Sequence, residues 1–435
     1  MSQAITTSEA RAVVGELWRQ QVMDVVRGAT FIGVLLLAWI SLRPFIDLGD
    51  SSDLTTGNEA LTYVAFGGFA VLMAALATRD HLQGLLTLLS PGYILFGAWI
   101  VATVVLSLDP ATSVRRLALI VSVTAVAATL LLLPKNQSEL MRWFSIAALT
   151  LLAVCYLGLL LVPNLSIHLA TDAQEPALAG NWRGVFGHKN NAAGVMAMLL
   201  FLGIYIVRSG AWLSGVVIVG LASLFLLYSA GKSSLALCFA VLVLTSLAAA
   251  VRSFWLRAVM LLAPLMLLNL LGIGSVMNES LAEMSKMLPL DSSFTGRTDI
   301  WIFGLQAAQL RLPTGYGFAA FWGSSAVQNL PEGMEWAATA AHSHNGYLDT
   351  TLAMGVPGLA LLIAVFVIAP LRNFQTADGG GNNGPLAMAF LQIWLFGIYL
   401  SSLESFFFDR ADPLWFTFLI AVFGLHYLAR FSVRE

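Results

Sequence analysis

The sequence predicts an all-α, polytopic membrane protein with about twelve transmembrane helices and a large outer loop between the ninth and the tenth. Three observations predict it. The chain has 435 residues, of which 58% are hydrophobic and only 11% are charged, and its mean hydropathy is +0.81. A soluble domain carries about 25% charged residues, so a water-soluble globule is excluded. The net charge of −2 gives no basic excess, and nucleic acid is therefore not an expected partner.

Apolar runs of the length that a spanning helix needs, about 20 residues, recur along the chain. They fall at 28–45, 60–77, 84–106, 116–133, 142–162, 191–207, 210–229, 233–251, 254–276, 349–370, 386–403 and 413–430. The third run contains Pro91 and Gly92, which predict a bend in it. Cys155 and Cys238 lie inside apolar runs and indicate no disulfide.

The distribution of Lys and Arg sets the predicted orientation. With the N-terminus inside, the inner segments hold slightly more basic residues than the outer ones, so both termini are expected to be cytoplasmic. We expect one integral membrane domain over 1–435, with two long outer loops at 163–190 and 277–348.

The first outer loop ends in a polar, basic segment at 181–191 that leads directly into a span. It contains Arg183 and Lys189, and Asn190 or Asn191 could cap the following helix, whose N-terminus favours an anion. The alternative is a capped loop with solvated charges.

A second polar segment, 229–234, joins two spans and reads Ser-Ala-Gly-Lys-Ser-Ser. It lacks the earlier glycine and the preceding strand of a nucleotide-binding loop. Lys232 is therefore interpreted as a positive charge at the outer face of the membrane.

In the large outer loop, Gly296-Arg297 is followed by a predicted amphipathic helix over 298–310 and a turn at 313–318. Before the tenth span lie His342, His344 and Asn345. The two histidines would not share a helix face, and no Cys or Glu cluster adjoins them, so no metal site is predicted. A histidine here could act as a general base, contact phosphate, or simply occupy the membrane interface.

Further side chains at this face could take part. Aromatic residues that could stack on sugars, or simply occupy the interface, are Tyr316, Trp322, Trp336 and Tyr347. Acidic residues that could replace a histidine as the base are Asp349, Glu404, Asp409 and Asp412. Glu404 differs from the other acids because it lies beside the apolar run 406–408.

These segments predict an outer-face cavity ringed by Arg183, Lys232 and Arg297, with a histidine nearby. Cations at fixed positions suit a diphosphate. A diphosphate at a membrane surface indicates a lipid-linked substrate, although the same charges would suit an anion transporter.

The order of these segments resembles the O-antigen ligase and polysaccharide polymerase family. The residues that carry the resemblance are Arg183, Gly187, Asn190, Ser229 to Lys232, Gly296, Arg297, Pro313, Gly315, Gly317, His344, Asn345, Leu348, Gly355 and Gly358. Nearly all of it lies between about 181 and 370. The first 160 residues add only their hydropathy.

The resemblance implies a membrane-embedded glycosyltransferase at the periplasmic face of a bacterial inner membrane, with no cofactor and no metal. Its partners would be an undecaprenyl-diphosphate-linked glycan donor and acceptor in the lipid bilayer, with a flippase and a chain-length regulator as candidate partners. It implies catalytic roles for His344, Arg297 and Lys232, the last where relatives often have Arg. The residues expected to bind substrate are Arg183, His342, Asn345, Tyr316 and Glu404.

The family contains two main reactions. The Gly-Lys-Ser segment and the run 341–348 resemble exopolysaccharide polymerases of the succinoglycan type, so a polymerase is favoured. An O-antigen ligase that transfers polymer to lipid A core is the alternative. A transporter of lipid-linked glycans is less favoured, because the sequence shows no repeated halves.

Overall fold

The computed structural model describes residues 7–49, 59–173, 175–287, 297–324, 327, 340–379 and 384–432. Within these ranges the chain is helical, and the only extended pairing is an isolated antiparallel bridge between Ile167 and Trp182. The predicted all-α class is confirmed.

Twelve apolar helices make up the body of the described part. Eight are long and apolar enough to cross a membrane. They are the latter part of α1 (Thr7–Ile40), α3 (Glu59–Asp80), α6 (Pro110–Leu130), α7 (Gln137–Leu161), α9 (Lys189–Arg208), α11 (Lys232–Ala250), α12 (Phe254–Leu271) with η2 (Ile273–Val276), and α15 (Gly346–Leu362) with η6 (Ile363–Ile368) and α16 (Ala369–Asp378). Four are shorter: α5 (Pro91–Val105), α10 (Trp212–Tyr228), α17 (Gly384–Leu400) and α18 (Pro413–Leu428).

Each of the twelve predicted ranges overlaps one of these helices, while the number that cross a membrane stays a prediction. The third range differs from expectation. It is divided into the short α4 (Leu82–Leu86) and α5, and Pro91 occupies the first turn of α5. Proline cannot donate the backbone hydrogen bond that a helix interior needs, so it begins a new helix rather than bending one.

The centre of the bundle is built from α9, α17 and α18. Nearly all side chains of α17 and α18 are buried, as are 78% of the residues in the most apolar part of α9. In contrast, only 17% of the corresponding part of α3 is buried. Helices that are apolar all round are expected in an interior, where every face meets protein.

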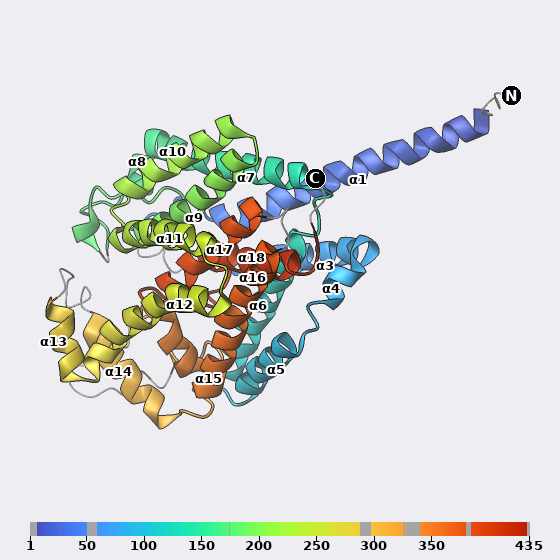
Figure 1. Ribbon diagram of the computed structural model, residues 1–435. Helices are drawn as coiled ribbons and strands as arrows, with labels where there is room; N and C mark the ends of the chain where they lie inside the picture. Colours follow the sequence, from blue (N-terminus) through green and yellow to red (C-terminus); the bar gives the residue numbers. More distant parts are fainter. Residues whose placement is uncertain are drawn as a thin grey trace.

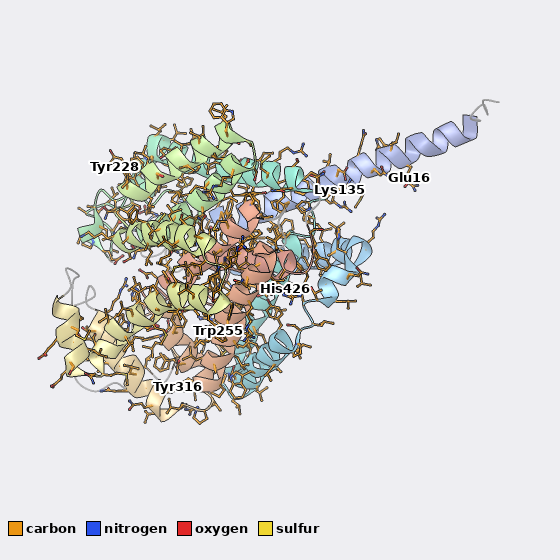
Figure 2. All side chains as sticks on the ribbon, viewed as in Figure 1. Glu16, Lys135, Tyr228, Trp255, Tyr316 and His426 are labelled. Carbon is orange, nitrogen blue, oxygen red and sulfur yellow. The ribbon has the colours of Figure 1, made fainter. Side chains whose placement is uncertain are left out.

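The two predicted outer loops lie on the same side of the molecule. Figure 1 shows α8 (Pro163–Ser166), α13 (Glu279–Met287) and α14 (Arg297–Leu310) at the left. The N-terminal half of α1 projects to the upper right. Figure 2 shows Glu16 on this projecting part and Lys135 where α1 joins the body, and the Lys135 ammonium pairs there with Asp24.

The predicted helix and turn of the large loop are confirmed as α14 and the turn that follows it, which is joined to a break in α15. At Gly355 the backbone takes φ +68°, so the helix is interrupted. The Tyr316 and Gly317 N–H groups donate to Leu352 and Ala353 carbonyls at 2.7 and 3.1 Å, and the Val356 N–H donates to the Leu312 carbonyl at 2.7 Å. The break supplies these carbonyls and holds the end of α14 against α15.

Candidate active site

Glu404, in the segment between α17 and α18, joins three parts of the chain. Its Oε1 accepts hydrogen bonds from Arg297 Nη2 at 2.9 Å and from Asn190 Nδ2 at 3.0 Å. Its Oε2 lies 3.2 Å from His344 Nδ1. Arg297 also donates to the carbonyl of Leu403. The structure therefore brings Arg297, His344 and Glu404 together, although they lie up to 107 residues apart in sequence.

The carboxylate of Glu404 is held in its ionised form. Burial alone would raise its pKa, but the hydrogen bond from His344 and the charge of Arg297 lower the pKa of Glu404 to about 2. The ionised Oε2 favours the His344 tautomer with a proton on Nδ1. That tautomer leaves a lone pair on Nε2, which can accept a proton.

His344 has a strained backbone. Its φ is +55°, in the left-handed region that side chains other than glycine adopt at a cost of about 1–3 kcal/mol. The following residue, Asn345, fixes this geometry as the N-cap of α15, since its Oδ1 accepts from the N–H groups of Tyr347 and Leu348. Its Nδ2 donates to the Ser402 carbonyl at 3.0 Å and to Asn269 Oδ1 at 3.3 Å.

Two histidines hold the start of α9, which carries Asn190. His168 Nε2 accepts from the Lys189 N–H at 3.2 Å, and His188 Nδ1 accepts from the Asn190 N–H at 3.1 Å. Hence His188, rather than Asn190 or Asn191, is the N-cap. His168 in turn contacts Asp172 at 2.9 Å, and burial lowers the pKa of His168, so the ring stays neutral and its Nδ1–H donates.

Lys232 stands at the first position of α11, beside the same helix start. Lys189 Nζ donates to the Ala230 carbonyl at 3.1 Å, so the turn at 229–232 lies against α9. A Cβ on Gly231 would come within 2.3 Å of Ala193 Cβ, so only glycine allows this approach. The Lys232 side chain is exposed. The charges of Lys232 and Glu404 both interact electrostatically with Lys189. The segment is a tight turn that presents a cation, and no strand precedes it in the described part of the chain.

Arg183 takes a different place from the one predicted. Its side chain is completely buried, and its Nη1 and Nη2 donate to the carbonyls of Phe186 and Ile46 at 3.3 and 2.7 Å. Burial lowers its pKa. These contacts tie the first outer loop to the segment after α1 and leave no guanidinium surface for a ligand.

The Tyr316 side chain is also held by contacts within the protein. Its hydroxyl donates to the Ala307 carbonyl at 3.0 Å, its ring packs on Phe321, and the Arg311 guanidinium lies 5.2 Å from its centroid. Trp322 instead lines a cavity of about 600 Å³. Trp336 lies outside the described residues.

The side chains of Asn190, Arg297, His344 and Glu404 are called the Glu404 cluster below. His342 lies between this cluster and the cavity. Its ring centroid is 4.2 Å from that of His344, its Nδ1 accepts from the His344 N–H at 3.3 Å, and its side chain lines the cavity. Burial lowers the pKa of His342, so its ring is neutral at ordinary pH.

Two of the remaining acids have structural contacts, whereas Asp409 lines the cavity. Asp349 accepts from Trp322 Nε1 at 2.8 Å and from the Ser343 N–H. Asp412 caps α18 and accepts from Asn191 Nδ2 at 3.2 Å. Among the described acids, Glu404 is the one that contacts both a predicted catalytic cation and a predicted catalytic histidine.

Comparison with known proteins finds two similarities in sequence. A family model described as O-antigen ligase matches residues 215–363. This segment, about a third of the chain, is similar to that family. The chain is also similar to the exopolysaccharide production protein ExoQ of Rhizobium meliloti (strain 1021), with 37% identity over 82 residues, which is 18% of this chain and 19% of that relative. The aligned part thus spans about a fifth of the curated relative.

The O-antigen ligase segment includes Lys232, Arg297 and His344, whereas Asn190 and Glu404 fall outside it. The link from Asn190 to Glu404 was not predicted. The amide of Asn190 gives no local sign of a partner 214 residues away, and the only signal for Glu404 was a carboxylate beside an apolar run.

Proposed function

We propose that this membrane protein of the O-antigen ligase type is a glycosyltransferase that polymerises oligosaccharide repeat units carried on undecaprenyl diphosphate. The observation that carries the proposal is the Glu404 cluster, in which one ionised carboxylate holds both a guanidinium and an imidazole. A cation for a leaving diphosphate and a base for an attacking hydroxyl are the two groups that such a transfer needs.

The proposed reaction is a displacement at the anomeric carbon of the donor sugar. A hydroxyl oxygen of the acceptor forms the new glycosidic bond, and its proton passes to His344 Nε2. The bond from the anomeric carbon to the diphosphate oxygen breaks, and the diphosphate leaves with the electron pair. Arg297 and Lys232 stabilise the developing negative charge. Arg297 carries five N–H donors, of which its contacts with Glu404 and Leu403 use two.

The proposal of polymerisation draws on the similarity to a protein named for exopolysaccharide production. Ligation of polymer to lipid A core is the second candidate, favoured by the description of the matching family model. Both reactions would use the same cations and base, and they differ in the acceptor. We further propose the inner membrane as the location, with the cluster at the periplasmic face.

Deletion of the gene in its host, followed by sizing of surface and secreted polysaccharide, tests the proposal. Complementation would use the wild type, Arg297→Ala, His344→Ala and Lys232→Met. Loss of one cation should lower the rate by about 10²–10³. Lys135→Met is the matched control, because Lys135 pairs with Asp24 away from the cluster.

Loss of long polymer, with single repeat units still made and lipid A core intact, is the expected result for a polymerase. Long polymer that remains on its carrier and is absent from lipid A core would indicate a ligase. Normal polymer length from Arg297→Ala would contradict the mechanism for both reactions.

A further inference from the structure

The cavity beside His342 is distinct from the Glu404 cluster, but some of the residues that line it follow Glu404 in the sequence. Residues 407–410, which follow Glu404 closely, line it together with Trp322 of the large loop, and its volume is about 600 Å³. This is within the range of small-molecule sites, about 300–1,000 Å³. A neighbouring cavity of about 280 Å³ shares Arg116, Trp322 and Arg410 and adds Arg115.

The lining combines an aromatic ring with charges of both signs. Trp322 is fixed in orientation by its hydrogen bond to Asp349, at 2.8 Å. Asp349 and Asp409 stand in the same wall as Arg116 and Arg410. Carboxylates accept from hydroxyl groups and guanidinium groups donate to them, while an indole face packs on the apolar face of a sugar ring. A mixed set of this kind suits a ligand rich in hydroxyls better than an isolated anion.

The position of the cavity indicates which sugar it would hold. His342 lines it, and the adjacent His344 contacts Glu404, with 4.2 Å between the two ring centroids. In the proposed displacement the diphosphate leaves toward Arg297, and the attacking hydroxyl must approach the anomeric carbon from another direction. A sugar in the cavity would approach past the two histidines, from the side of His342.

We infer that this cavity is the subsite for the terminal sugar of the acceptor glycan, with Trp322 as its stacking platform and His342 as a positioning residue for the attacking hydroxyl. The inference rests on the proposed function and adds the place of the acceptor. It assigns roles to four residues that line the cavity, Trp322, Arg116, Arg410 and Asp409.

The test measures binding of a defined probe to the purified full-length protein in detergent. The probe is the single repeat-unit oligosaccharide, released by mild acid from the lipid fraction of the deletion strain, and saturation-transfer NMR reports its affinity. We expect Trp322→Leu to weaken binding about tenfold, as loss of an aromatic contact does, while Trp322→Phe keeps most of it. Trp255→Leu is the matched control, because Trp255 is exposed on α12, where Figure 2 labels it.

Folding of each variant is judged by gel filtration, and Asp409→Asn provides a second substitution in the wall of the cavity if Trp322→Leu does not fold. Equal binding by the wild type, Trp322→Leu and Asp409→Asn would overturn the subsite, as would no binding by the wild type. Failure of the proposed function is distinguishable, because it would appear as normal polymer from Arg297→Ala in cells, whatever the binding result.

Discussion

At the scale of the residue, Glu404 sets the positions of its neighbours Arg297 and His344. An ionised carboxylate between a guanidinium and an imidazole orients both and sets the tautomer of the imidazole. In a sequence, Lys and Arg side chains appear only as charges. In the folded protein, their contacts differ sharply. Arg297 is held at the cluster, whereas the guanidinium of Arg183 donates only to backbone carbonyls in the described contacts.

Replacement of Glu404 by Gln tests this role. The amide keeps the size of the side chain but removes the charge that holds Arg297 and His344. We expect the rate of glycan transfer to fall by about 10²–10⁴, the range for loss of a base or of the carboxylate that orients it. The measurement is incorporation of lipid-linked repeat units into polymer by purified protein. Glu279→Gln, at an exposed position of α13, should retain full activity, and an unchanged rate in Glu404→Gln would remove the carboxylate from the mechanism.

How much of the site was predictable also depends on individual residues. Charge and position in an outer loop indicated Arg297, Lys232 and His344. The same reasoning selected Arg183, and Tyr316 was selected as an aromatic residue that could stack on a sugar. Neither is free to do so, because a sequence does not show which polar groups the backbone will need as partners. Both are buried, and both donate to backbone carbonyls, Arg183 to Ile46 and Tyr316 to Ala307 in α14.

At the scale of the element, the start of α9 and the turn before α11 form one unit. Their closeness depends on Gly231, and the apolar runs that predicted the helices contain no information on this contact. Hydropathy therefore gave the ranges of the helices, but not the packing that places Lys232 beside Lys189. The division of α4 from α5 was likewise visible in the sequence only as a proline.

Gly231→Ala should disturb this unit. Its Cβ would lie 2.3 Å from Ala193 Cβ, so the turn must move away from α9. We expect a loss of about 1–3 kcal/mol in stability, as for other overpacked contacts, and lower activity because Lys232 moves. Thermal unfolding in detergent measures the first effect. The double variant Gly231→Ala with Ala193→Gly removes the clash and should recover most of the loss; a loss that stays would assign the effect to another cause.

At the scale of the whole molecule, the Glu404 cluster links α9, α14, α15 and the segment before α18, so its charge state contributes to stability. The pKa of Glu404 is about 2 when folded, below the value of 4.5 for an ordinary Glu. Its contribution is therefore complete above about pH 4.5 and is lost as the pH falls toward 2, with a size of at most about 3 kcal/mol. The unfolding temperature of Glu404→Gln should lie below that of the wild type at pH 6, and the difference should shrink by pH 3. A constant difference would contradict the assigned pKa.

The arrangement of the helices also predicts which parts of the chain face the same compartment. The segments around α8, α13 and α14 lie on one side of the molecule (Figure 1), and the proposed site is built from residues near them.

Cys155 and Cys238 are both buried, so a new cysteine would be labelled against a low background. Ser280→Cys, at an exposed position of α13, should react with a membrane-impermeant maleimide in intact spheroplasts. Ser253→Cys, at the exposed N-cap of α12, should react only after the membrane is opened, because α12 separates the two positions. The reverse pattern would place the Glu404 cluster in the cytoplasm, where a periplasmic lipid-linked donor could not reach it.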